Sequence, residues 1–397
     1  MEFTFAERIQ ALKPSIIREI LKADPDPEAV SFAAGNPSPE TFPTEEMAKI
    51  AAEIFAGEAG DAFQYGITEG YTPLRSATAE RISEKYSVGR EFDDVIIVSG
   101  GQQGLELATK VLINENETLI CEAPSFIGAL NSFRAQRVNL VGVSCDDDGM
   151  KMDELEAALN THPEARVIYT IPTFQNPGGS TLSLERRKKM LELAKKYDVI
   201  ILEDSPYFEL RYEGEYVPTI KSMDDEGRVI FCGSYSKVVA PGIRIGYVCA
   251  HKDILAKMTV AKQVSDVHTN LFFQMLVSRL ITGGDFDAHI DACIKMYKEK
   301  LDLMISLLEK YVEPGKARWN KPAGGIFLWV ELPEGYDGME LCSVVKAKKL
   351  ACVPGNAFNV DEHAPSNCIR LNLSLPTVAQ IEKGCKILGD AINEFVK

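Results

Sequence analysis

A lysine that follows a run of small and polar residues is the strongest candidate for chemistry in this chain. Lys237 stands after Gly233-Ser234-Tyr235-Ser236 and before the apolar residues Val238-Val239-Ala240. Burial beside apolar residues disfavours the charged form of an amine, lowers its pKa and makes it a nucleophile toward carbonyl groups. Most lysines are instead solvated at the surface, so the position alone leaves both interpretations open.

Two groups of residues near this lysine could hold a phosphate. Gly100-Gly101-Gln102 follows an apolar run and begins a helical pattern, and the free N–H groups at the start of a helix favour an anion. An ordinary turn would have the same sequence. Arg244 lies seven residues after Lys237 and, together with Ser234 and Ser236, could bind the same anion.

A carboxylate and a guanidinium group occupy places where a charge needs a partner. Asp204 follows the apolar residues Val199–Leu202, where it could pair with a cationic ring nitrogen or simply begin a turn before Pro206. Arg370 interrupts the apolar run Cys368–Ser374. Many arginines in strands point to solvent, but one that points inward needs an anion, and a carboxylate matches its planar fork.

Short apolar runs that alternate with helical patterns position these residues. The predicted strands are Val95–Ser99, Thr118–Glu122, Val138–Val143, Val167–Ile171, Val199–Glu203, Val229–Gly233 and Ile245–Ala250, and helices are predicted at Gln102–Ile113 and Leu184–Tyr197. Strands separated by helices indicate an α/β unit with a mostly parallel sheet. Ligands of such sheets bind at the carboxyl ends of the strands, which is where the candidate residues stand.

The sequence outside this unit has a different pattern. Helical spacing continues from residue 250 to about Tyr311, and possible strands follow at Gly325–Glu331 and Cys368–Leu373 with a helix between them. The last helix is predicted to begin after Thr377, because Thr377 and Gln380 have the spacing of a capping box. These elements predict a smaller α+β domain that packs on the first.

The composition excludes several classes of protein. The chain has 397 residues and a net charge of −15, which argues against nucleic acid or an anionic membrane as its main partner. No apolar run reaches the roughly 18 residues of a spanning helix, and the N-terminus lacks the apolar core of a signal peptide. Nine cysteines without CxxC spacing and five isolated histidines predict neither a disulfide framework nor a metal site, and we expect a cytoplasmic protein.

The candidate residues, in this order along the chain, resemble the fold-type I pyridoxal-phosphate enzymes. The similarity is closest to the class I and II aminotransferases, in the branch of the 2-aminoadipate, kynurenine and multi-substrate aminotransferases. It spans nearly the whole chain, and its motifs are Ser31–Pro37 (SFAAGNP), Gln64–Arg75 (QYGITEGYTPLR), Ser99–Gly104 (SGGQQG), Pro172–Gly179 (PTFQNPGG), Glu203–Tyr207 (EDSPY), Gly233–Lys237 (GSYSK), Pro241–Gly246 (PGIRIG) and Ile369–Ser374 (IRLNLS).

The resemblance implies an arrangement of domains. It implies an N-terminal arm over residues 1–45, with a helical segment at Ser15–Lys22, which contributes to the small domain and the active site. A large domain with a mostly parallel sheet over residues 46–290 would bind the cofactor, and a smaller α+β domain would cover residues 291–397.

The resemblance also implies roles for the residues around the cofactor, pyridoxal 5′-phosphate. Lys237 would bond covalently to the cofactor and then move a proton between it and the substrate. Asp204 would keep the pyridine nitrogen protonated, so that the ring acts as an electron sink. Asn176 and Tyr207 would contact the phenolic oxygen, and Phe126, where many relatives have tyrosine, would stack on the ring.

The remaining implied roles concern the phosphate, the substrate and a second subunit. Gly101, Gln102, Ser234, Ser236 and Arg244 would hold the phosphate. Tyr65 would reach the phosphate of the neighbouring subunit, which implies a homodimer with shared active sites. Arg370 would bind the substrate α-carboxylate with Asn176 and Gly35 beside it, and Arg18 of the arm would meet the far end of the substrate.

We therefore expect an aminotransferase of amino acid metabolism, with a biosynthetic role. It would move an α-amino group from an amino acid to a 2-oxo acid, 2-oxoglutarate foremost, by a ping-pong mechanism. A β-lyase or a decarboxylase would use the same electron sink and remains an alternative. A regulator that senses the cofactor is less expected, because we find no room for the N-terminal DNA-binding segment of that class. A serine acyl-transferase would fit Ser234-x-x-Lys237, but the KTG motif of that family is absent.

Overall fold

An eight-stranded sheet lies at the centre of the larger part of the molecule. The computed structural model describes residues 3–10, 12, 28–361 and 363–397. The strands lie side by side in the order β2 (Asp93–Val98), β9 (Gly246–His251), β8 (Val229–Ser234), β7 (Ile200–Asp204), β6 (Ala165–Thr170), β3 (Thr118–Ala123), β4 (Asn139–Asp146) and β5 (Gly149–Met150). Strands β8, β7, β6, β3 and β4 are parallel, whereas β9 is antiparallel to both of its neighbours. The prediction of a mostly parallel sheet is confirmed.

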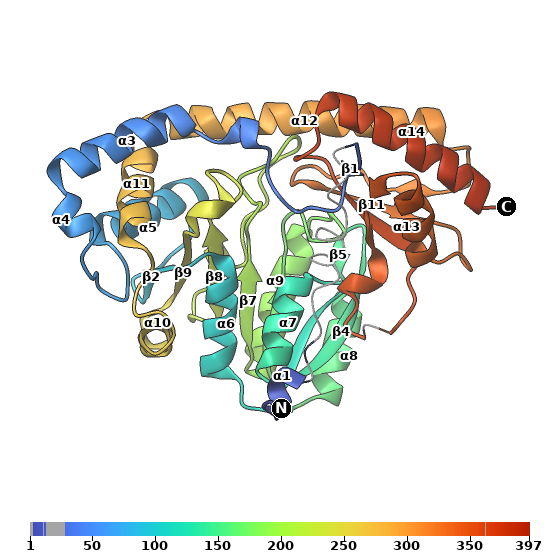
Figure 1. Cartoon of the computed structure of the whole chain (residues 1–397). Helices are drawn as coiled ribbons and strands as arrows, with labels where there is room; N and C mark the ends of the chain where they lie inside the picture. The colour runs from blue at the N-terminus through green and yellow to red at the C-terminus, as the bar shows by residue number, and fades with distance from the viewer. Residues whose placement is uncertain (1–2, 11, 13–27, 362) are drawn as a thin grey trace.

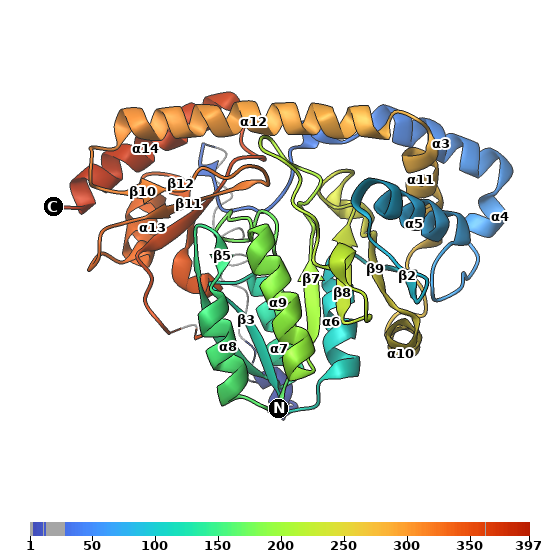
Figure 2. The same cartoon turned by 180° about the vertical axis from the view of Figure 1, so that it is seen from behind.

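Helices cover both faces of this sheet, which explains why its strands are apolar almost throughout. Side chains alternate between the faces: Val167 and Tyr169 of β6 pack toward α6 (Gly101–Leu112) and α7 (Ile127–Ala135). Ile168 packs toward α8 (Met152–Thr161) and α9 (Leu184–Tyr197) on the other face. Figure 1 shows α6 and α7 in front of the sheet, and Figure 2 shows α8 and α9 in front of it from the opposite side.

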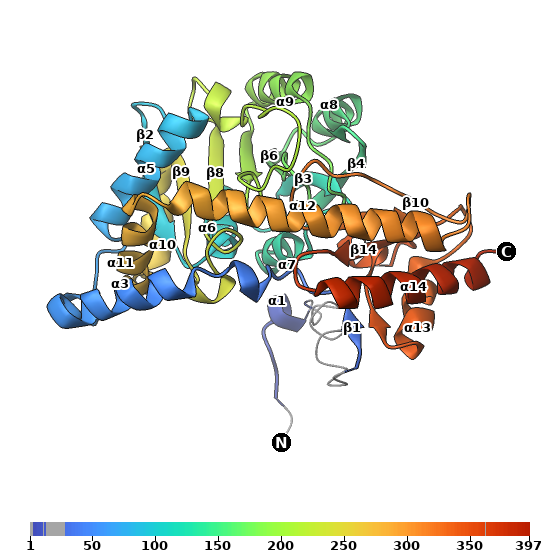
Figure 3. The ribbon, with the colours of Figure 1, turned by 90° about the horizontal axis from the view of Figure 1, so that it is seen from above.

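One long helix joins the two parts of the molecule. Helix α12 (Phe286–Tyr311) runs without interruption from the large sheet to the small domain, where it packs along α14 (Val378–Phe395) (Figure 3). The domain boundary expected between residues 290 and 291 falls inside this helix and stays a prediction. Further helices of the described residues are α1 (Glu7–Gln10), α3 (Thr44–Gly57), α4 (Ala59–Ala62), α5 (Thr72–Tyr86), α10 (Lys252–Gln263) and α11 (Leu271–Thr282), with single 3₁₀ turns at Pro39–Thr41, Lys221–Met223, Pro241–Ile243 and Gly355–Phe358.

The small domain is built on an antiparallel sheet. Its strands lie in the order β10 (Arg318–Trp319), β11 (Phe327–Glu331), β14 (Cys368–Asn372) and β13 (Val353–Pro354), with α13 (Gly338–Ala347) beside them. Part of the predicted arm joins this domain through a parallel pairing of β1 (Val30–Ser31) with β12 (Leu350–Ala351). Helix α14 begins with the predicted capping box between Thr377 and Gln380.

Two further observations concern the described residues alone. None of their helices is long and apolar enough to cross a membrane, and none of their His, Cys, Asp and Glu side chains gather into a cluster that could bind a metal ion. The helix predicted at Ser15–Lys22 lies outside the described residues.

Candidate active site

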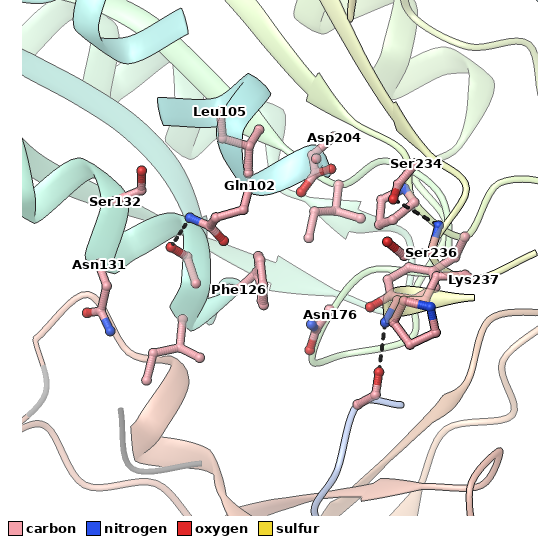
Figure 4. A pocket seen from close by; sticks show the side chains of 18 of the residues that line it. Gln102, Leu105, Phe126, Asn131, Ser132, Asn176, Asp204, Ser234, Ser236 and Lys237 are labelled. Atoms are coloured by element: carbon pink, nitrogen blue, oxygen red, sulfur yellow. Dashed lines mark hydrogen bonds between the residues drawn. The ribbon is translucent and has the colours of Figure 1, made fainter. Parts of the chain in front are cut away.

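A cavity of about 950 Å³ lies at the carboxyl ends of the central strands, where the large sheet meets the small domain (Figure 4). It contains most of the residues that the sequence singled out. Those that line it are Gly35, Gly101, Gln102, Phe126, Asn176, Asp204, Tyr207, Ser234, Ser236, Lys237, Arg244 and Arg370. The chain thus brings together residues from β7, β8, the start of α6 and β14, which are far apart in the sequence.

Lys237 lies in the turn that follows β8, against the apolar residues that predicted its burial. Val238 and Val239 are buried, and the Lys237 Nζ donates a hydrogen bond of 2.7 Å to the Gly35 carbonyl oxygen. Burial, reinforced by the nearby charges of Arg370 and Arg244, lowers the pKa of the Lys237 amine to about 8. The neutral, nucleophilic form of this amine is therefore accessible close to physiological pH.

Asp204 is a buried carboxyl group at the end of β7. Its Oδ2 accepts a hydrogen bond of 2.9 Å from the Tyr169 hydroxyl. Burial raises the pKa of Asp204 to about 7, although Tyr169 and the charge of Lys237 act in the opposite direction. A cationic ring nitrogen in the cavity would stabilise the ionised form of this carboxyl, so the residue suits the partner that the sequence suggested.

The residues predicted to hold a phosphate surround the N-terminus of α6. Gly100 precedes this helix with a positive φ of 83°, and a β-carbon there would clash with the Arg244 guanidinium group. Arg244 Nη2 donates to the Ser99 carbonyl oxygen at 3.1 Å, and the Ser236 N–H donates to the Ser234 hydroxyl oxygen at 3.1 Å. First-turn N–H groups, two hydroxyls and one guanidinium group form a donor set that matches a phosphate.

Phe126 stands directly before α7, and its ring is held in place by a close contact. A β-carbon on Gly128 would lie within 2.4 Å of this ring, so only glycine leaves the ring room to pack there. The Gln102 side chain donates to the Gly128 carbonyl oxygen at 2.7 Å. An aromatic ring fixed in the wall of the cavity can stack on a planar cofactor.

Arg370 points inward from β14 and is completely buried. Its Nη1 donates to the Asn176 Oδ1 and its Nη2 to the Ala33 carbonyl oxygen, both at 2.9 Å. The guanidinium carbon lies 4.1 Å from the centroid of the Phe327 ring and 4.8 Å from that of Phe358.

Arg370 nevertheless lacks a full set of partners. Among the described residues, its buried Nε has no hydrogen-bond partner. Burial lowers the pKa of the guanidinium group to about 10. A buried cation with an unpaired donor is costly, and an anion in the cavity would compensate both the charge and the donor.

Tyr207 completes the floor of the cavity. Its ring packs edge-on against Phe327, with 5.7 Å between the centroids, and burial raises the pKa of its hydroxyl, which also interacts with Asn176. The Lys237 Nζ lies 5.8 Å from the centroid of the Tyr207 ring.

One predicted residue, Tyr65, does not line this cavity. Tyr65 is 79% exposed and packs edge-on against His268 at 5.7 Å, and its predicted contact with a neighbouring subunit stays a prediction. Arg18 lies outside the described residues.

Three residues that the sequence did not predict support the predicted charges: Tyr169 contacts Asp204, and Phe327 and Phe358 contact Arg370. Tyr169 carried a usable signal, because a tyrosine within an apolar strand must find a partner for its hydroxyl.

Comparisons with known proteins show the family to which the chain belongs. Residues 27–388 match the family described as aminotransferase class I and II. Aromatic-amino-acid aminotransferase 1 of Thermococcus litoralis is 42% identical over 99% of this chain and 95% of its own length. The 2-aminoadipate transaminase of Thermus thermophilus is 37% identical over 98% of this chain and 95% of its own length.

The fold agrees with solved structures as well. The multiple substrate aminotransferase of Thermococcus profundus superposes with a TM-score of 0.94 at 41% identity, over 98% of this chain and 97% of that one. The chain therefore belongs to the class I and II aminotransferases. It is a transferase enzyme with the α/β architecture of fold type I, as the resemblance implied.

Proposed function

We propose that the cavity around Lys237 is the active site of this aminotransferase and that 2-oxoglutarate is its amino acceptor. The enzyme moves an amino group from an amino acid to a 2-oxo acid. The observation that supports the proposed site best is the meeting of the Lys237 amine, the Asp204 carboxyl and the Arg370 guanidinium group in one cavity. The similarity to named aminotransferases favours transfer over the β-lyase and decarboxylase alternatives.

Pyridoxal 5′-phosphate is the cofactor of the enzyme, and when bound it accepts the electron pair that is left as the substrate Cα loses its proton. The Lys237 Nζ would hold the cofactor, and the same amine would carry the proton from the substrate Cα to the cofactor. A pKa of about 8 suits an amine that must both accept and donate a proton near neutral pH.

Asp204 and the N-terminus of α6 would bind two different groups of the cofactor. Asp204 would pair with the ring nitrogen and hold a proton there, which would maintain the positive charge of the ring. Gly101 and Gln102 offer backbone N–H groups to the phosphate, and Ser234, Ser236 and Arg244 add their side chains.

Arg370 binds the α-carboxylate of the substrate. The carboxylate supplies the acceptor that the buried Nε lacks, and Asn176 orients the guanidinium group from its other end. Gly35 also lines the cavity. A β-carbon there would come within 3.3 Å of the Phe327 ring, on which the Arg370 guanidinium group lies. A substrate held in this way presents its Cα–H bond to Lys237.

A homodimer with shared active sites would complete the cavity. Exposed aromatic side chains gather near Tyr65: Phe55 stacks on Phe63 and on Phe272, with 5.7 Å and 5.0 Å between ring centroids, and Phe63 is 73% exposed. Exposed apolar patches of this kind typically mark an interface. Docking of a second subunit on this patch would bury it and bring Tyr65 toward the neighbouring phosphate.

We infer the substrate class from the names of similar enzymes. Similar proteins are named for aromatic amino acids, for 2-aminoadipate and for kynurenine, and we propose that this cytoplasmic enzyme accepts aromatic and acidic amino acids. Arg18 would meet the acidic end of a dicarboxylic substrate.

The test is a screen of amino donors against 2-oxoglutarate and pyruvate. Without a 2-oxo acid, an active donor should change the absorbance of the cofactor once and release about one equivalent of its own 2-oxo acid per site. Parallel lines in the double-reciprocal plot should follow when both substrates are varied. Continuous release of ammonia or carbon dioxide without an acceptor would contradict amino transfer.

A further inference from the structure

A buried carboxyl group lies outside the cavity and is not used by the mechanism above. Glu122 belongs to β3 and is completely buried. Its Oε1 accepts from the Thr170 hydroxyl at 2.6 Å and its Oε2 from the Gln175 Nε2 at 3.1 Å, while the Ile171 N–H lies 3.2 Å from each oxygen. Every one of these partners is a donor, so both oxygens are arranged as acceptors.

Gln175 links this carboxyl to the loop that enters the cavity. Its Nε2 donates to the Pro124 carbonyl oxygen at 2.9 Å as well as to Glu122, and its Oε1 accepts from the Gly178 N–H at 2.6 Å. Its backbone carbonyl oxygen accepts from the Gly179 N–H at 2.6 Å. Two acceptors at one end of the amide and one donor at the other leave Gln175 a single orientation.

Asn176 follows Gln175 directly and extends into the cavity (Figure 4). Its Oδ1 accepts the Nη1 hydrogen bond of Arg370 at 2.9 Å. A turn closed by Gln175 thus carries the side chain that orients the proposed carboxylate-binding arginine.

The geometry points to Glu122 and Gln175 as positioning residues that fix Asn176, and through it Arg370, for the substrate carboxylate. The inference rests on the proposed function of the cavity, but the link from Glu122 to the loop exists whatever the reaction is. Burial raises the pKa of Glu122 to about 7, and Asp204, Tyr169, Cys121 and Cys145 are the titratable groups around it. The test is therefore made at pH 8.5, where the carboxyl is ionised.

The first measurement is amide hydrogen exchange in the holoenzyme, with Glu122→Gln and Gln175→Met as variants. A glutamine at position 122 offers one acceptor oxygen in place of two, and a methionine at position 175 offers no amide. We expect exchange at the N–H groups of Gly178 and Gly179 to become about tenfold faster in each variant, which corresponds to one lost hydrogen bond. Unchanged exchange of the Gly178 and Gly179 N–H groups would overturn the inference. Because both variants test the same link, this criterion holds even if one of them folds poorly.

The second measurement separates KM from kcat. We expect KM for the amino donor to rise about tenfold in each single variant while kcat changes less than about threefold. Because both residues act through one contact, the double variant should be no worse than Gln175→Met alone. Additive losses in the double variant, or a loss in kcat with KM unchanged, would overturn the inference.

Glu203→Gln is the matched control. Glu203 is also a buried glutamate at the end of a central strand, and it accepts from the N–H groups of Ile220 and Lys221 at 3.1 and 2.8 Å and has no hydrogen bond to Gln175. Its substitution should lower the melting temperature while leaving the exchange of Gly178 and KM unchanged. An equal rise of KM in this control would show that the loss of any buried glutamate charge has the same effect on KM. That result would overturn the specific role of Glu122 and Gln175. A wild-type enzyme without transaminase activity would instead refute the proposed function and leave the exchange result standing.

Discussion

Substitution of Arg370 by lysine tests how this enzyme recognises an amino acid. The side chain keeps its charge but loses the planar fork, so it cannot bind Asn176 and Ala33 together and still present a second donor to the substrate. It also loses the flat group that lies against Phe327, because an ammonium group does not stack in this way.

The magnitude follows from the bonds that are lost. A hydrogen bond to a charged group contributes about 1.5–3 kcal/mol net, and at about 1.4 kcal/mol per factor of ten this is roughly ten- to a hundredfold in kcat/KM. Arg370→Lys should lose at least one such bond to the substrate carboxylate. The loss should be confined to substrates that have that carboxylate.

Phenylalanine and 2-phenylethylamine form the matched pair of substrates, since the second is the first without its carboxylate. The half-reaction is followed by the absorbance of the cofactor in a stopped-flow instrument, with saturating cofactor. We expect phenylalanine to lose the calculated factor and 2-phenylethylamine to change less than about twofold. Equal losses for both amines would show that Arg370 supports the fold of the site and does not bind the carboxylate.

Three further predictions follow from the same site. Asp204→Asn should lower the rate of the chemical step by orders of magnitude while cofactor binding persists in part, and Asp204→Glu should be milder; near wild-type rates in single-turnover assays of Asp204→Asn would move the role elsewhere. In the cofactor-free protein, burial lowers the pKa of Lys237 to about 8, against 10.5 for a free lysine. Burial of the charged amine therefore destabilises the fold by its full amount below about pH 8, and by progressively less between pH 8 and 10.5. Thermal unfolding should therefore show Lys237→Met to be more stable than the wild type at pH 7, with a gap that narrows as the pH rises; a gap independent of pH would contradict the burial of the amine. Arg18→Ala should lose about ten- to a hundredfold in kcat/KM toward 2-aminoadipate and almost nothing toward leucine, and equal losses would assign Arg18 to the fold or the dimer.

The fold was predictable wherever a local pattern carried it. The helix predicted at Leu184–Tyr197 has those bounds in the structure, and the spacing of Thr377 and Gln380 located the start of α14. The parallel pairing of Val30–Ser31 with Leu350–Ala351 had no such signal, because strands of two residues show no periodicity and the partners lie far apart in the chain.

The site residues likewise divide into those with a local sequence signal and those that depend on contacts made only in the folded chain. Lys237 and Arg370 stand out because a charge beside or within an apolar run needs an explanation, and the structure places both in the cavity. Glu122 escaped notice, since its meaning depends on Thr170 and Gln175, which approach it only in the folded chain. Tyr65 needs a second subunit before its position can be interpreted.

Attachment of the cofactor to Lys237 is the central claim, and chemical trapping tests it most directly. Two fully buried lysines, Lys221 and Lys262, are already paired with carboxylates, whereas the Lys237 amine donates to a carbonyl oxygen in the cavity wall. Borohydride reduction of the holoenzyme, followed by digestion and peptide mapping, should place the reduced cofactor on Lys237 alone, and Lys237→Ala should carry none. A label on any other lysine of the wild-type enzyme would contradict the account.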